Sequence, residues 1–442
     1  MIKKTIPSQF KINILAGISA NVANVLITLI SYPSYLHFLG YEKYGVWIVL
    51  STILTFTQLS NLGIGTAVVK FVAEEHGLRN YAGIQSYVTT AIFLLTVTGL
   101  SAFFLILLFK TQIVGMFNLS VTNTAVSIKL LPYMALLSVY VFIVQVFSAT
   151  LSGIGRIDLA NYSDTCGRVL ALVVSVSLLA LGWGLESLIF GSMLSYLFIH
   201  VSTLYLIYHQ IPLRILRISN VDSLRLKKML SIGGGMFGSS LISILLGPFN
   251  KLLLSRYVGV SVVPLYEIAF NGAMQLRSLI ESGLRAVSPE ISRLSGNMNY
   301  EAISKINDMN RKAVRLIWLY GAPFFVLLIF LLDPLLMLWL GKRYVDTLPF
   351  VFRIMLAGTF FSLLGVPSYY ILLGLGQTKQ IFIAHVIQSC INAALALLLL
   401  YLGFKLSVLS VSLFATTGMV IAHISIVQQK RMVIKSYLAK IA

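Results

Sequence analysis

Few side chains in this sequence are charged, and eight of the charged ones lie inside long apolar segments. An ionised side chain at the centre of a bilayer costs about 2.5–3.5 kcal/mol on insertion scales, so such residues usually face a cavity or a partner. Five of the eight are cationic and three are anionic, which leaves a surplus of positive charge: Asp164, Arg168, Lys251, Glu267, Arg277, Glu281, Arg285 and Arg353.

One segment, near residues 262–288, carries charges at helical spacing. Arg277, Glu281 and Arg285 are four residues apart, so in a helix they fall within a stripe about 80° wide. Glu281 could bridge both arginines and simply hold helices together. Alternatively, because one carboxylate cannot neutralise two guanidinium groups, the remaining charge binds an anion such as phosphate. Lys251 is a third candidate cation for that anion, unless it extends to the membrane interface.

The other buried charges suggest ion coupling or structural ion pairs. Glu267 and Glu281 are the candidate carriers of a coupling proton. Asp164 and Arg168 are four residues apart and can neutralise each other, so a structural pair is favoured. His385 fits a packing hydrogen bond better than a proton relay.

The first apolar segment has a face of small and polar residues instead of charges. Gly17, Asn21, Asn24, Thr28 and Ser31 recur at spacings of four and three, and Gln58 adds an amide in the next segment. Small residues allow close helix packing in membranes. The functional alternative is a cavity wall on which Asn21, Asn24 and Gln58 hydrogen-bond sugar hydroxyls.

The elements that must position these residues are transmembrane helices. The 442 residues are 58% apolar and 11% charged, with a mean hydropathy of +0.90, which excludes a soluble enzyme and a disordered chain. Long continuous apolar runs predict helices rather than barrel strands. We expect an all-α protein with twelve spans, near 12–36, 46–72, 84–109, 128–152, 160–182, 185–209, 230–256, 262–288, 313–341, 347–373, 381–402 and 406–428.

The distribution of Lys and Arg predicts the orientation of the chain. The net charge is +19, and basic residues concentrate in cytoplasmic loops of membrane proteins. With both termini in the cytoplasm, 21 of the 33 Lys and Arg fall on that side and seven on the other. The basic charge therefore indicates contact with anionic membrane lipid, and no nucleic acid partner is expected.

The sequence also repeats itself at an offset of 221 residues. Paired glycines recur at this offset, as in Gly153 and Gly374, or Gly182 and Gly403. We therefore expect an N-terminal six-helix bundle (1–212), a cytoplasmic linker (213–229) and a C-terminal six-helix bundle (230–442). Two like-oriented halves imply a pseudo-two-fold axis along the membrane normal, an arrangement typical of alternating-access transporters.

Motifs for bound cofactors do not occur in the sequence. It contains neither a P-loop nor a zinc-ligand spacing, and its two cysteines, Cys166 and Cys390, lie in separate apolar segments. We expect no cofactor, no metal and no enzymatic activity. Transport would then depend on an ion gradient or on the membrane potential.

Two short motifs lie near the start of the sequence. The first loop contains Leu39-Gly40 and then Tyr44-Gly45-Val46-Trp47, and the second segment contains Leu62-Gly63-Ile64-Gly65. These motifs resemble those of the polysaccharide flippase family, the Wzx-type translocases within the multidrug/oligosaccharidyl-lipid/polysaccharide exporter superfamily. The resemblance implies a V-shaped, MATE-like pair of six-helix bundles in the bacterial cytoplasmic (inner) membrane. It implies that undecaprenyl-pyrophosphate-linked oligosaccharide is flipped to the outer leaflet for O-antigen or another surface polysaccharide. Candidate partners are then a proton or sodium ion, a glycan polymerase and a chain-length regulator.

Three alternative functions remain open. An ion-coupled drug exporter of the same superfamily would need cavity carboxylates for cationic drugs, and the first segment has none between Lys11 and Glu42. A major-facilitator transporter would carry a Gly-x-x-x-Asp-Arg-x-Gly loop, whereas residues 73–80 have a different sequence. A membrane glycan polymerase would need a large outer loop, and the expected outer loops are short.

Overall fold

The computed structural model describes residues 8–58, 63–212, 221–284, 291, 293–295 and 298–441. Regular secondary structure in this part of the chain is entirely helical, as the apolar runs predict. The chain divides into two compact units, residues 1–238 and 239–442. The expected linker at 213–229 lies partly outside the described residues, and the expected domain bounds stay a prediction.

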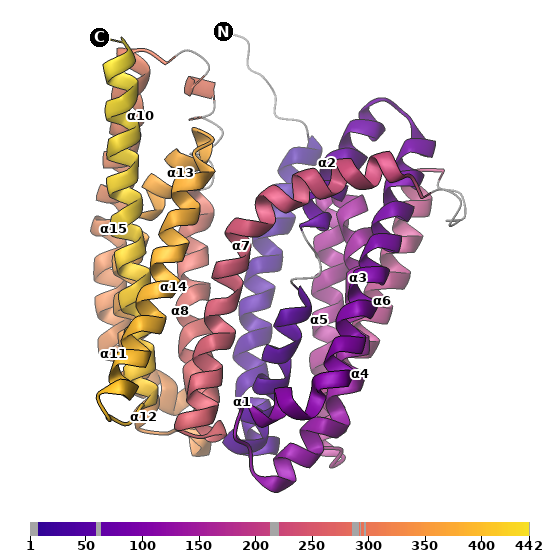
Figure 1. Ribbon diagram of the computed structural model, residues 1–442, viewed down its shortest axis with the longest axis vertical. Helices are drawn as coiled ribbons and strands as arrows, with labels where there is room; N and C mark the ends of the chain where they lie inside the picture. Colours follow the sequence, from indigo (N-terminus) through magenta and orange to yellow (C-terminus); the bar gives the residue numbers. More distant parts are fainter. Residues whose placement is uncertain are drawn as a thin grey trace. The chain divides into compact units, whose positions relative to one another are not determined.

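The N-terminal unit is built from long helices that run side by side (Figure 1). Helix α1 is broken at Gly40, where φ is +70°, so it combines the first predicted span with the start of the second. The helices of this unit are α1 (Ser8–Gln58), α2 (Ile64–Gly77), α3 (Tyr81–Gly115), α4 (Val121–Gly153), α5 (Ile157–Ala180), α6 (Glu186–Gln210) and the first part of α7 (Ser223–Tyr257).

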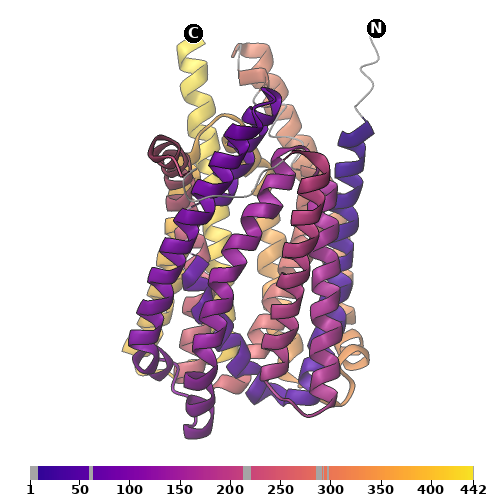
Figure 2. The same ribbon diagram turned by 90° about the vertical axis from the view of Figure 1, so that its right-hand side faces the viewer.

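Neighbouring helices in this unit pack in pairs. Helices α5 and α6 form one extensive contact, α3 and α4 another, and α4 also packs on α6; Figure 2 shows them from the side. One core is formed by Val68 and Phe71 of α2, Tyr87 of α3 and Phe142 of α4, all buried. Phe71 and Tyr87 stack with ring centroids 4.7 Å apart.

The C-terminal unit contains the rest of α7 and the remaining helices. Helices α12 and α13 are bent by 43° relative to each other at a short break. The elements are η3 (Val260–Val262), α8 (Val263–Leu284), α10 (Tyr300–Leu316), η4 (Ile317–Gly321), α11 (Ala322–Leu340), η5 (Gly341–Arg343), α12 (Thr347–Leu363), α13 (Val366–Gly374), α14 (Thr378–Tyr401) and α15 (Val408–Ile441).

The internal repeat has a counterpart in the backbone. Helix α14 begins and ends 221 residues after α5. Gly155 and Gly376 precede these two helices with φ of +85° and +72°, while Gly182 and Gly403 follow them with φ of +87° and +76°. Each helix is therefore entered and left through a glycine in the left-handed region, which side chains other than glycine rarely adopt.

The described helices are those of a multi-pass membrane protein. Eight are long and apolar enough to cross a bilayer, or nine if the bent pair α12 and α13 forms one span. Every one of the twelve predicted apolar runs coincides with helix in this part of the chain, but the number of twelve spans stays a prediction.

Candidate functional site

The charged stripe on α8 takes part in a polar network inside the C-terminal unit. Arg277 Nε lies 3.3 Å from Glu281 Oε2, one helical turn away, and the two side chains are 17% and 20% exposed. Tyr370 of α13 donates to the other oxygen of Glu281, at 3.0 Å. Glu281 thus interacts with a cation and a hydroxyl from two helices.

Two other helices provide partners for the same guanidinium group. Arg277 Nη1 donates to Ser362 Oγ of α12 at 3.4 Å, and Nη2 lies 3.2 Å from His423 Nε2 of α15. His423 Nδ1 lies 2.8 Å from the carbonyl oxygen of Met419. A carbonyl oxygen only accepts and a guanidinium only donates, so His423 is neutral, with its proton on Nδ1. Arg277 therefore links α8, α12 and α15.

A second polar cluster joins α7, α8 and α14. Lys251 Nζ lies 2.7 Å from Glu267 Oε2, and each side chain is 16% exposed. Next to this pair, Asn250 donates to Tyr266 Oη at 2.8 Å and accepts from Asn392 at 2.7 Å. Asn250, Tyr266 and Asn392 are each 1% exposed or less.

These contacts correct the expected surplus of cations. Lys251 does not extend to the interface as a free cation, because Glu267 pairs with it. Arg353 is bonded to Asp333 of α11, a further carboxylate within the predicted apolar run 313–341. Within the described residues every one of the singled-out cations has an acidic partner, since Arg168 and Arg277 are paired as well.

The remaining predicted residues lie apart from this network or outside the described part. Asp164 and Arg168 of α5 pair with each other at 2.8 Å and are about half exposed. His385 of α14 is partly buried. Arg285 and the side chain of Gln58 lie outside the described residues.

Asn21 and Asn24 of α1 and the charged network of Arg277 belong to different units of the chain. Asn21 is exposed and Asn24 is partly buried. Asn24 Oδ1 is shielded from solvent without a hydrogen-bond partner. Both belong to the N-terminal unit, whereas the network of Arg277 belongs to the C-terminal one.

Sequence reasoning also missed a polar joint between α1 and α5. Asp158 accepts from Gln9 at 3.0 Å, and Asn13 accepts from the backbone N–H of Asp158 at 3.1 Å. Arg156 binds both carboxylate oxygens of Asp158 at 3.1 Å, and this hydrogen bonding raises the pKa of Arg156. The joint holds the start of α1 against the start of α5, a contact between residues about 145 positions apart.

Comparison with known proteins assigns the chain to a family. Residues 37–349 match the family described as "Polysaccharide biosynthesis protein". The chain belongs to this family. A protein of Shigella flexneri named "Putative O-antigen transporter" is 23% identical over 369 residues, which cover 81% of this chain and 84% of that protein.

Solved structures share the fold. A multidrug resistance MATE family transporter of the MOP superfamily, in an inward-facing conformation, has a TM-score of 0.76 and 14% identity over 100% of this chain and 98% of that one. The lipid II flippase MurJ, in an inward closed conformation, has a TM-score of 0.71 and 16% identity over 93% and 87%. The MATE-like fold expected from the sequence is confirmed.

The described residues offer no ready metal centre. No group of three or more His, Cys, Asp or Glu side chains in this part of the chain is placed to hold a metal ion. The chemistry available to the site is hydrogen bonding and ion pairing by Arg, Lys, carboxylate, amide and hydroxyl groups.

Proposed function

We propose that this protein moves undecaprenyl-pyrophosphate-linked oligosaccharide units from the inner to the outer leaflet of the bacterial cytoplasmic membrane, for O-antigen or another surface polysaccharide. The family match over residues 37–349 carries the proposal. The names of two similar proteins, an O-antigen transporter and a lipid II flippase, support it. Both names describe movement of a substrate rather than enzymatic conversion.

The proposed site uses the paired cations of the C-terminal unit. A phosphate group competes with Glu281 for Arg277, and with Glu267 for Lys251, because guanidinium and ammonium groups bind phosphate and carboxylate oxygens alike. Arg285 is the third proposed cation. Asn21, Asn24 and Gln58 are proposed to hydrogen-bond the sugars.

The ion pairs suggest how the empty protein returns. Once the head group leaves, Arg277 and Lys251 pair again with Glu281 and Glu267, so the charges of these two cations are neutralised on the return step. The anionic head group carries net charge outward instead. Moving one charge across 100 mV changes the free energy by about 2.3 kcal/mol, so an inside-negative potential drives export. A proton or sodium ion is the alternative coupling ion for the two carboxylates.

Transport by the purified protein in vesicles tests the proposal. Fluorescent lipid-linked oligosaccharide is placed in both leaflets, and the fraction reached by an added membrane-impermeant quencher is followed with and without an imposed potential. We expect the protein to speed the exchange between leaflets, and a potential negative on the cytoplasmic side to bias it outward. Exchange no faster than in protein-free vesicles would contradict the proposed function.

The site is tested separately by Arg277→Lys, which keeps the charge but loses the planar fork of donors. We expect slower transport of the pyrophosphate-linked substrate, by about tenfold if one charge-assisted hydrogen bond is lost. Arg311→Lys is the matched control, because Arg311 forms an exposed pair with Asp308 on α10. Equal rates in both variants would refute the role of Arg277 while leaving the function intact.

The same preparation distinguishes the alternatives. A drug exporter would move cationic dyes and leave the lipid-linked sugar in place. A glycan polymerase would lengthen the oligosaccharide, which glycan gels detect. It would do so with the purified protein alone, without a partner polymerase.

A further inference from the structure

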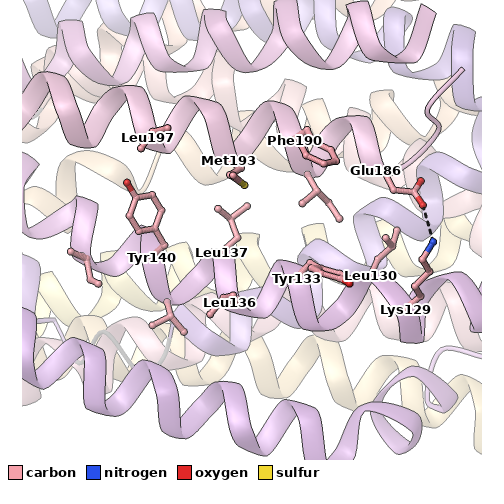
Figure 3. Close-up of a pocket in the computed structure, with 13 residues that line it drawn as sticks. Lys129, Leu130, Tyr133, Leu136, Leu137, Tyr140, Glu186, Phe190, Met193 and Leu197 are labelled. Atoms are coloured by element: carbon pink, nitrogen blue, oxygen red, sulfur yellow. Dashed lines mark ion pairs between the residues drawn. The ribbon is translucent and has the colours of Figure 1, made fainter. Parts of the chain in front are cut away.

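A large groove lies between α4 and α6 of the N-terminal unit, whereas the charged network belongs to the C-terminal unit. Its volume is about 830 Å³, and its lining is apolar apart from one charged end (Figure 3). This volume falls in the upper range of small-molecule pockets. Leu137 of α4 and Met193 of α6 face each other across its middle.

The groove is at least as long as one membrane leaflet is thick. On α4 it extends from Lys129 to Ile143, and on α6 from Glu186 to Leu197. These helical stretches rise about 21 Å and about 16 Å, at least half of the roughly 30 Å hydrocarbon thickness of a bilayer. A hydrocarbon chain in one leaflet therefore fits along it.

One end of the groove lies at the level of the membrane interface. Glu186 is the first residue of α6, and the preceding turn carries Trp183, half exposed and in edge contact with Phe190. Tyr133 is exposed one turn along α4 from Lys129. Exposed Trp and Tyr collect at the lipid–water interface, so this is the end at which a lipid head group would lie.

The two charges at this end match a head group that carries both signs. Lys129 Nζ and Glu186 Oε1 are 3.6 Å apart, with side chains 71% and 39% exposed. An ion pair this exposed stabilises little, so opening it to admit a ligand costs little. An ammonium beside a carboxylate complements a phosphate beside a primary ammonium.

We propose that the groove between α4 and α6 binds a phosphatidylethanolamine-type phospholipid. Its acyl chain lies between Leu137 and Met193, its phosphate contacts Lys129, and its primary ammonium donates to Glu186. At the deep end, the hydroxyl of Tyr140 is bonded to His200 Nδ1 at 2.7 Å, so the chain meets a satisfied polar pair. No residue that lines the groove belongs to the proposed transport site, and this proposal does not depend on that site.

Native mass spectrometry of the detergent-purified protein tests the proposal. The protein is titrated with phosphatidylethanolamine, phosphatidylcholine and phosphatidylglycerol of identical acyl chains. Phosphatidylcholine keeps the positive charge but has no N–H to donate, and phosphatidylglycerol has no cation. We expect the ethanolamine lipid to bind about tenfold more tightly than either, a difference typical of one hydrogen bond to a charged group. Equal binding of all three would overturn the head-group assignment.

Variants then locate the site. Leu137→Trp and Met193→Trp fill the groove and are expected to abolish the tight adduct, whereas Leu338→Trp, at an 86% exposed position of α11, should retain it. Glu186→Gln is expected to lose the preference for the ethanolamine lipid, because the primary ammonium then has no carboxylate to accept from it, and the charge swap Lys129→Glu with Glu186→Lys to keep it. Thermal unfolding confirms that each variant is folded.

Two results would overturn the proposal. One is an unchanged ethanolamine-lipid adduct in both folded tryptophan variants of the groove. The other is displacement of phosphatidylethanolamine by an equal concentration of polyprenyl phosphate, which would assign the groove to an isoprenoid carrier.

Discussion

Arg277 shows how one side chain in the C-terminal unit connects several helices. It has acceptors on its own helix α8, on α12 and on α15. His423 can accept from Arg277 at Nε2 because its own proton lies on Nδ1, next to the carbonyl oxygen of Met419. An arginine in the membrane persists at moderate cost when it is paired in this way.

Removal of the arginine alone should destabilise the protein strongly. In Arg277→Met, Glu281 loses its cation, and breaking a buried pair from one side costs about 3–5 kcal/mol. Because both side chains keep some exposure, we expect about 3 kcal/mol, measured by denaturant unfolding in detergent. Arg168→Met, in the half-exposed pair with Asp164, should cost under about 1 kcal/mol.

The double variant Arg277→Met, Glu281→Gln separates the pair from the packing. With both charges removed, it should be more stable than Arg277→Met alone. A double variant that is as unstable as the single one would show that the arginine acts by packing and not by pairing.

At the scale of elements, glycines determine how closely the helices approach and where they begin. Gly365, at the break between α12 and α13, lies against α15 at His423. Gly155 and Gly376 form the left-handed turns before α5 and α14. A side chain at Gly365 would collide with α15, whereas a side chain at Gly155 or Gly376 would strain the backbone.

We expect Gly365→Ala to disturb the Arg277 network from a distance. The new Cβ would lie 2.7 Å from the Cβ of His423 and 3.1 Å from its carbonyl oxygen, so α15 must move. Overpacking of this kind costs about 1–3 kcal/mol, measured by thermal unfolding. Gly247→Ala on α7 is the control, since its Cβ would meet nothing within 4 Å; equal losses in both would contradict the close approach.

Alanine at the repeated glycines should have matching effects in the two units. Gly155→Ala and Gly376→Ala each force a side chain into the left-handed region, at about 1–2 kcal/mol. Asparagine tolerates this region better, so Gly155→Asn and Gly376→Asn should recover part of the loss in denaturant unfolding. A loss at only one of the two positions would argue against equivalent turns.

At the scale of the whole molecule, apolar helices and basic charge make this chain a multi-pass membrane protein of the polysaccharide biosynthesis family. The even number of predicted spans predicts that both termini lie on one side, and the excess of Lys and Arg predicts that this side is the cytoplasm.

Reporter fusions test this orientation. Alkaline phosphatase fused after residue 441 should be inactive, because it stays in the cytoplasm. The same reporter placed after Phe404, in the turn between α14 and α15, should be active. An active reporter after residue 441 together with an inactive one after Phe404 would show the opposite orientation. Activity at both positions would contradict the prediction that α15 crosses the membrane between them.

Properties that depend on local pattern follow from the order of the residues alone. Long apolar runs require helices because the bilayer offers no hydrogen bonds to the backbone. Glycine pairs at a fixed offset predicted the equivalent α5 and α14. Two short loop motifs pointed to the family that residues 37–349 match.

The pairing of the charges, in contrast, depends on how the helices pack against one another. Glu281 and Arg277 are neighbours on one helix, but Tyr370, Ser362 and His423 join them from positions 85 to 146 residues away. Asp333 reaches Arg353 from another helix in the same way. Helical spacing specifies the face of one helix and not the residue opposite it, so a sum of charges along the sequence overstated the free positive charge.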